Sequence, residues 1–302
     1  MDQIDDKTLK AVIRKCKKAV KENKGKGDNT FLCSGSVSEL IANMKVMKEL
    51  GGGDLYIRIF GKPLENDFYA DMHEMLTYRM THLEPAYFDM DTYEYYKPLL
   101  EAQPYVKSVN VYEGNEVTFN LDMFRYCFFN ESCSDKTMGI LLNAINETWG
   151  LKISFSEPWI SVDGEANPDR RILVARSLKY HGGDMCYTML NTLLKSSAFF
   201  FGTDQEYMNF IVCCDLLWRL RPENVIELAK CVKGMKIVMT NECPIYWLAL
   251  ALGSKQIHYE LCPDFYYGIT DNPNVQYFLG LTYVKPDVTF PTVKKSKRKK
   301  NV

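Results

Sequence analysis

The clearest pattern in this chain is an alternation of apolar strand, short polar turn and helix that repeats through residues 170–262. In the last round, an apolar run at 235–239 is followed by a polar turn at 240–244 and by an apolar stretch at 245–252 that Gly253 ends. Strands that alternate with crossover helices form a parallel sheet, and such sheets bind ligands beyond the carboxyl ends of their strands. The pattern therefore predicts an α/β domain with a ligand site along one edge of its sheet.

Both halves of the chain contain this alternation. In the second half it predicts strands at 172–175, 198–201, 216–218, 236–239 and 256–259, with helices at 184–195, 205–212, 222–233 and 244–252. In the first half it predicts helices at 6–22, 39–50 and 137–149, with strands at 30–33, 54–59, 107–112 and 117–121. The predicted fold class is therefore α/β, with two Rossmann-like domains that face each other across a cleft.

The stretch at 158–168 contains two prolines, a glycine and an asparagine, which is typical of an interdomain linker. We therefore predict a first domain at 1–165, with an extra helix at its start, and a second domain at 166–285. The tail at 286–302 contains the basic run KKSKRKK. Runs of like charge are usually disordered and solvated, and contact of this tail with an anion, a membrane or nucleic acid stays open.

The composition is that of a soluble globular protein, with 46% hydrophobic residues, 25% charged residues and a net charge of −1. A net charge so close to zero gives no reason to expect a nucleic-acid-binding surface over the whole protein. The ten cysteines show no C-x-x-C spacing and the four histidines show no ligand spacing, so we expect no metal site. The start of the chain is charged, and no apolar run approaches the ~20 residues that span a bilayer. We therefore expect a cytoplasmic protein in a reducing compartment.

The first candidate site is a loop at a predicted strand-to-helix turn. Gly35, Ser36 and Ser38 precede Glu39, where the predicted helix begins. Backbone N–H groups and the helix dipole favour an anion at such a place, and a serine there can cap the helix. An ordinary capped turn explains the same residues, so both interpretations stay open.

The segment SGSVSELIANMKVMKELGGGDLYI at 34–57 resembles the opening of the heptosyltransferase-like (ADP-heptose:lipopolysaccharide) glycosyltransferases, in particular a small bacterial and phage branch. The resemblance recurs in the same order along the chain at 98–114, 120–125, 172–181, 199–210 and 225–262. It therefore covers most of the chain. It implies a GT-B-like fold in which the acceptor binds the first half and a nucleotide-activated sugar binds the second half, with no metal and no other cofactor.

The resemblance also implies roles for individual residues. In that family an acidic residue of the first loop takes the proton of the acceptor hydroxyl, and this role falls on Glu39, in a loop that Gly35, Ser36 and Ser38 shape. The nucleotide-sugar donor would be bound by residues near strand ends of the second half: Arg176, Ser177, Lys179, His181, Gly202, Thr240, Asn241 and Glu242. Two cations and a hydroxyl beyond a strand end suit a diphosphate, and a solvated surface is the alternative explanation for the cations.

The chain departs from the family pattern at three places. The family's Gly-Asp is Ser38-Glu39 here, so the carboxylate stands on a side chain that is one methylene longer. The usual Gly-Asn-Gln-Ser turn is replaced at 240–243, where a carboxylate at Glu242 would repel a diphosphate. The Glu-Gly expected in the following helix is Leu-Ala at 250–251.

Three hypotheses follow. The first is a metal-independent glycosyltransferase that moves a sugar from a nucleoside diphosphate sugar to a hydroxyl on a glycan, a protein or a modified nucleic acid. The second is a catalytically inactive binding or structural protein of the same fold, because fold does not guarantee function. The third, suggested by the basic tail, is a nucleic-acid-modifying variant. Three further acids near strand or helix ends, Asp204, Glu206 and Glu260, are expected on solvated faces.

Overall fold

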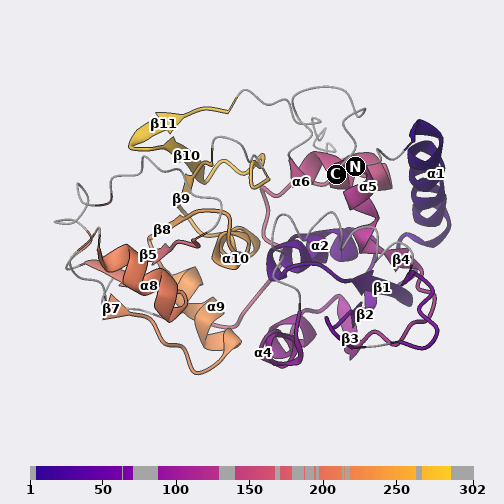
Figure 1. The fold of residues 1–302 in the computed structure, drawn as a ribbon, viewed down its shortest axis with the longest axis horizontal. Helices are drawn as coiled ribbons and strands as arrows, with labels where there is room; N and C mark the ends of the chain where they lie inside the picture. The colour runs from indigo at the N-terminus through magenta and orange to yellow at the C-terminus, as the bar shows by residue number, and fades with distance from the viewer. Residues whose placement is uncertain are drawn as a thin grey trace, which may run out of the picture.

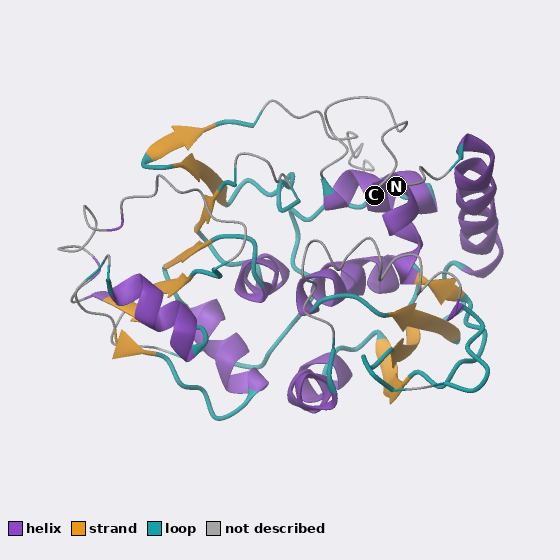
Figure 2. Ribbon diagram, viewed as in Figure 1, coloured by secondary structure: helices purple, strands orange, loops and turns teal. Residues whose placement is uncertain are grey.

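The computed structural model of the protein describes residues 5–62, 64–70, 88–128, 140–166, 171–178, 187, 194, 197–212, 214, 218–262 and 267–286. These residues form two α/β lobes that lie side by side, each built on its own sheet (Figure 1). Helices surround both sheets (Figure 2), so the predicted α/β class with two Rossmann-like units is confirmed. The predicted domain boundary at 165 stays a prediction.

The first lobe contains a parallel four-stranded sheet in the order β3-β2-β1-β4. Its strands are β1 (Asn29–Cys33), β2 (Gly53–Ile57), β3 (Val106–Val111) and β4 (Phe119–Asn120). Its helical elements are α1 (Asp6–Asn23), α2 (Val37–Glu49), α4 (Met90–Glu101), the 3-10 helix η2 (Leu121–Met123), α5 (Phe124–Phe128) and α6 (Leu141–Trp149). The predicted strands are present with shifted ends, whereas α4 and α5 were not predicted.

The second lobe contains a seven-stranded sheet in the order β11-β10-β9-β8-β5-β6-β7, parallel except for the antiparallel pair β10 and β11. Its strands are β5 (Ile172–Ala175), β6 (Ala198–Phe200), β7 (Trp218–Arg219), β8 (Ile237–Thr240), β9 (Ile257–Glu260), β10 (Val275–Leu279) and β11 (Thr282–Val284). Its helices include α8 (Asp204–Ile211), α9 (Val225–Gly234) and α10 (Pro244–Leu252). The hairpin of β10 and β11 escaped prediction because it departs from the strand–helix alternation.

Two predicted features lie wholly or mostly outside the described residues. The helix expected at 184–195 is described only at two positions, and the tail from 287 onward is not described. Among the helices within the described ranges, none combines the length and the apolar character needed to cross a membrane.

Helices α2 and α10 lie between the two sheets and pack against each other (Figure 1). Residues 37–47 of α2 are buried, and so is every residue of α10 after its first proline. The run IYWLALAL makes α10 apolar on all of its faces, which suits a helix that is covered on all sides. The two helices join the apolar interiors of both lobes into one continuous core.

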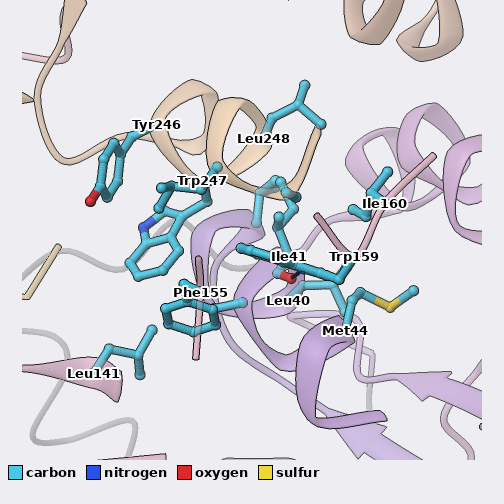
Figure 3. Packing of buried hydrophobic residues seen from close by; sticks show 14 of the residues in the cluster. Leu40, Ile41, Met44, Leu141, Phe155, Trp159, Ile160, Tyr246, Trp247 and Leu248 are labelled. Atoms are coloured by element: carbon cyan, nitrogen blue, oxygen red, sulfur yellow. Dashed lines mark hydrogen bonds between the residues drawn. The ribbon is translucent and has the colours of Figure 1, made fainter. Parts of the chain in front are cut away.

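The segment at 155–162, here called the joining segment, packs between the lobes. The indole N–H of Trp159 donates to the Ile41 carbonyl of α2 at 2.7 Å, and the backbone N–H of Trp159 donates to the Ala251 carbonyl of α10 at 3.0 Å. The ring of Phe155 lies 5.0 Å from that of Trp159 (Figure 3). The joining segment overlaps the expected linker, but it differs from an exposed linker because its aromatic residues are buried against both lobes.

Candidate functional site

Within the described residues, a group of buried ionisable side chains lies where the first turn of α2 approaches the start of α10. Five buried side chains gather there: Glu39 from α2, Arg125 from α5, Glu242 from the turn before α10, Tyr259 from β9, and Tyr267. We call these five residues the junction. Burial raises the pKa of the Tyr267 phenol, and the negative charges of Glu39 and Glu242 raise it further, which shows that acids from both lobes lie close to one ring.

Glu39 is held by the backbone at the start of its own helix. Its Oε2 atom accepts the Ser36 backbone N–H at 2.9 Å, and the Ser36 hydroxyl oxygen accepts the Glu39 backbone N–H at 3.3 Å. This reciprocal arrangement is a capping box, which satisfies two of the free N–H groups of α2. The carboxylate also lies at the positive end of the helix dipole, where an external anion would otherwise bind.

The same carboxylate forms a buried ion pair with Arg125. The Arg125 Nη2 atom lies 2.6 Å from Glu39 Oε2, and its Nη1 atom lies 3.0 Å from Asp122 Oδ1. Burial lowers the pKa of the Arg125 guanidinium, but the charges of Glu39 and Asp122 raise it by more, so the net shift is upward. Asp122 in turn accepts the Ser34 hydroxyl at 2.6 Å. One buried cation is therefore shared between two buried carboxylates.

Gly35 and Ser38 complete the first loop. A Cβ atom at position 35 would overlap Glu39 Oε2 and Arg125 Nη2, so the ion pair leaves room only for glycine there. Ser38 is buried in the first turn of α2, directly before Glu39. The loop at 35–38 was predicted to bind an anion or the acceptor. In the structure, the ion pair of Glu39 and Arg125 fills the space beside this loop.

In the second lobe, Arg176 follows β5 and is paired with Glu260 at the end of β9. Arg176 Nε lies 2.8 Å from Glu260 Oε2 and Nη2 lies 3.0 Å from Oε1, a bidentate geometry. The Tyr187 hydroxyl donates to Glu260 Oε2 at 3.0 Å. Glu260 is buried, so its expected place on a solvated face was wrong. The burial of Glu260 was not predicted because its partner, Arg176, lies 84 positions away in the chain.

Ser177 and Asn241 connect the ends of β5 and β8. The Asn241 side chain accepts the Ser177 backbone N–H at 2.9 Å and donates to the Ser177 carbonyl at 3.0 Å. Thr240, at the end of β8, is buried and its hydroxyl lies 3.1 Å from the Cys243 sulfur. These polar groups stand at the carboxyl ends of adjacent parallel strands, where sheets of this kind bind ligands.

Glu242 follows Asn241 in the chain and is buried, and both of its carboxyl oxygens accept hydrogen bonds from neutral donors. Its Oε1 atom accepts the Trp247 indole N–H at 2.6 Å, and its Oε2 atom accepts the Tyr259 hydroxyl at 2.9 Å. Burial raises the pKa of the Glu242 carboxyl to about 7, and the nearby charge of Glu39 contributes in the same direction. This carboxyl therefore exchanges a proton near neutral pH, a property that clusters at functional sites.

Three further residues were predicted to bind the donor, and the structure describes one of them, Gly202. Gly202 follows β6, and its carbonyl accepts a hydrogen bond from Arg219 at 3.2 Å. Lys179 and His181 lie outside the described residues. No group of three or more histidine, cysteine or acidic side chains suited to a metal ion occurs in the described part of the chain.

The sequence analysis assigned no role to Arg125, Asp122 or Tyr259. Arg125 and Asp122 lie within the 120–125 stretch that carries the family resemblance, which was the available signal. Tyr259 was assigned only to an apolar strand. Nothing in the local pattern indicates that these side chains meet acids from other elements.

No protein-family model matches the chain, and no curated protein matches it. Similar solved structures include a glycosyl transferase family 9 protein from Veillonella parvula, with 9% identity over 82% of this chain and 84% of that chain and a TM-score of 0.43. They also include E. coli heptosyltransferase WaaC with ADP-2-deoxy-2-fluoro heptose, with 10% identity over 82% of this chain and 92% of that chain and a TM-score of 0.38. At these values the similarity concerns the general arrangement of elements and assigns no residue its role.

Proposed function

We propose that this protein is a glycosyltransferase that moves a sugar from a nucleoside diphosphate sugar to an acceptor hydroxyl without a metal ion. The observation that carries the proposal is the junction, where a carboxylate of the first lobe approaches the strand ends of the second lobe. Strand carboxyl ends are the usual ligand site of parallel α/β sheets. The resemblance of the sequence to heptosyltransferase-like enzymes supports the same chemistry.

In the proposed reaction Glu39 takes the proton of the acceptor hydroxyl, and the hydroxyl oxygen attacks the anomeric carbon of the sugar. The bond between that carbon and the diphosphate oxygen breaks, and the nucleoside diphosphate leaves with the bonding electron pair. Arg176, Ser177 and Asn241 would bind the diphosphate, together with Lys179. The acceptor class stays open between a glycan, a protein and a modified nucleic acid.

This chemistry requires two ion pairs to open. Glu39 must part from Arg125 before it takes a proton, and Arg176 must part from Glu260 before it binds a phosphate. Breaking a buried ion pair leaves charges without compensation, which costs several kcal/mol. A bound donor and acceptor must supply that free energy through their own contacts.

The same two ion pairs favour a second candidate function. A catalytically inactive protein of this fold would hold its former catalytic carboxylate and its donor-binding arginine in permanent internal contacts, as Glu39 and Arg176 are held here. Glu242 adds a carboxyl group at the strand ends where a diphosphate would lie. Such a protein would bind a polymer or another protein through its surface and transfer nothing.

Titration with nucleoside diphosphates and their sugars separates the two functions. A ligand at 100 times its dissociation constant adds about 2.7 kcal/mol to the free energy of unfolding, so a true donor raises the melting temperature measurably. Glu39→Gln should keep donor binding and abolish sugar transfer or donor hydrolysis, whereas Glu147→Gln, at an exposed position of α6, should change neither.

If no nucleotide raises the melting temperature at millimolar concentration, the donor assignment is wrong. If a nucleotide sugar binds but the parent protein neither transfers nor hydrolyses it, the inactive binding protein is the better description.

A further inference from the structure

Among the described residues, Glu242 differs from Glu39, the other carboxyl group of the junction, because its charge has no cationic partner. The carboxylate of Glu39 is compensated by Arg125 at 2.6 Å. The partners of Glu242 are the Trp247 indole and the Tyr259 hydroxyl, both of which are neutral donors. Within the described residues, no lysine, arginine or histidine forms an ion pair with Glu242. An uncompensated buried carboxylate costs far more free energy than its neutral form.

The surroundings of Glu242 on the side of the first lobe add to this imbalance. Glu39 lies close enough for its charge to act on Glu242, and Glu39 shares its cation, Arg125, with Asp122. Ionised Glu242 therefore adds a second buried negative charge near Glu39, whose own charge is already compensated by Arg125. The charges of Glu39 and Glu242 both act on the Tyr267 phenol, which stays neutral because burial raises its pKa.

The groups from the second lobe are neutral as well. Burial raises the pKa of the Tyr246 and Tyr259 phenols, and burial raises the pKa of the Cys243 thiol to about 11. The Thr240 hydroxyl carries no charge. Burial raises the pKa of Glu242, by contrast, to about 7, so its charge changes near neutral pH.

We propose that Glu242 makes the contact between the two lobes sensitive to pH: the neutral carboxylic acid allows α2 and α10 to pack closely, and its ionisation loosens that contact. The proposal does not depend on glycosyl transfer, because it concerns only the packing of the two lobes. A pH-dependent contact at this place would also control access to the strand ends of both sheets.

The direction of the effect follows from proton linkage. Burial raises the pKa of the Glu242 carboxyl from an ordinary 4.5 to about 7, so the folded protein holds this proton more tightly than the unfolded chain does. The contribution of Glu242 to stability is therefore most favourable at low pH. It is lost as the pH rises through the window from 4.5 to about 7, and it changes little above that window.

The test compares the melting temperatures of the full-length protein and of Glu242→Gln between pH about 5 and about 8. The difference between the two curves removes the contributions of all other titrating groups. We expect the parent to lose roughly 5 °C relative to Glu242→Gln across this range. The matched control, Glu147→Gln, removes an exposed carboxylate of α6 and should run parallel to the parent. Parallel curves for Glu242→Gln and the parent would overturn the proposal.

Hydrogen exchange then shows which helices lose protection when the contact between α2 and α10 loosens. After correction for the intrinsic pH dependence of exchange, peptides from α2 and α10 of the parent should lose protection between pH about 6 and about 8. Peptides from α1, which contributes no residue to the junction, should keep their protection over this range, and Glu242→Gln should abolish the loss in α2 and α10. Equal loss of protection in α1 would overturn the proposal, because the effect would then be global.

Tyr259→Phe provides an independent variant in case Glu242→Gln does not fold. It removes a hydrogen bond to the ionised carboxylate and should raise the pKa of Glu242, so the pH midpoint of the stability loss should move upward. An unchanged midpoint in Tyr259→Phe would contradict the assignment of the transition to Glu242.

Discussion

At the scale of single residues, Arg125 determines the electrostatics of the first lobe. It is fully enclosed and pairs with Glu39 and Asp122, which are themselves buried. A buried pair of this kind contributes little net stability compared with apolar packing, but the loss of one partner leaves the other charges uncompensated. The position of Glu39, and with it any catalytic role, therefore depends on an arginine that the local sequence does not relate to it.

Arg125→Met should lower the free energy of unfolding by about 3–5 kcal/mol, because two carboxylates stay buried without their cation. Arg219→Met is the matched control: it breaks an ion pair with Asp204, whose side chain is 86% exposed, and should cost about 1 kcal/mol or less. Urea denaturation measures both. Similar losses in the two variants would show that the Arg125 pair is no more important than a surface contact.

At the scale of secondary-structure elements, the joining segment and the helices α2 and α10 form one packed unit. Trp159 contributes an indole hydrogen bond to α2, a backbone hydrogen bond to α10 and a ring contact to Phe155. Two helices that are packed through buried faces cannot shift far relative to each other without losing contacts, because protein interiors are close-packed. The lobes are therefore joined through packed side chains as well as through the chain itself.

Trp159→Ala should cost about 3–5 kcal/mol, since it removes a large buried side chain and leaves a cavity. Trp218→Ala offers a control of identical chemistry at a position that is 56% exposed, and it should cost about 1 kcal/mol or less. Chemical denaturation monitored by circular dichroism provides the values. A small effect of Trp159→Ala would mean that the joining segment behaves as an ordinary exposed linker.

At the scale of the whole molecule, one apolar core extends through both lobes. Two domains that share only a linker unfold separately, whereas a shared core couples them. The arrangement of α2, α10 and Trp159 therefore implies that the two sheets are stable together and unstable apart.

We expect both lobes to unfold in one transition. Hydrogen exchange measured at increasing urea concentrations should show peptides from β2 and from β9 losing protection with the same midpoint and slope. The pH for this experiment should lie below about 6, where Glu242 is neutral in the folded protein. Two separated midpoints would contradict a shared cooperative core.

Much of the fold was predictable because it rests on local signals. Apolar runs of strand length, Gly253 after α10 and the Ser36–Glu39 capping box all lie within a few residues of the features they specify. The helix α4 was missed because it lies in a polar, tyrosine-rich stretch with Pro98 inside it. The hairpin of β10 and β11 was missed because no crossover helix separates its strands.

The candidate site was predictable only in part. The first loop and the ends of β5 and β8 were identified from the sequence, because glycine, serine and charged residues at strand ends have local signatures. The partners of those residues were not, since Glu39 and Arg125 are 86 positions apart and Arg176 and Glu260 are 84 apart. Whether a charged side chain is free for a ligand depends on such partners.

The sequence by itself determined the alternation of strands and helices and the kinds of chemical group at the strand ends, because these depend on neighbouring residues. Only the tertiary structure decided that Glu39 and Arg176 are held in ion pairs, that no cation in the described part of the chain pairs with Glu242, and that the joining segment is buried. Those outcomes depend on distances between elements far apart in the chain, and such distances are set by how the two lobes pack.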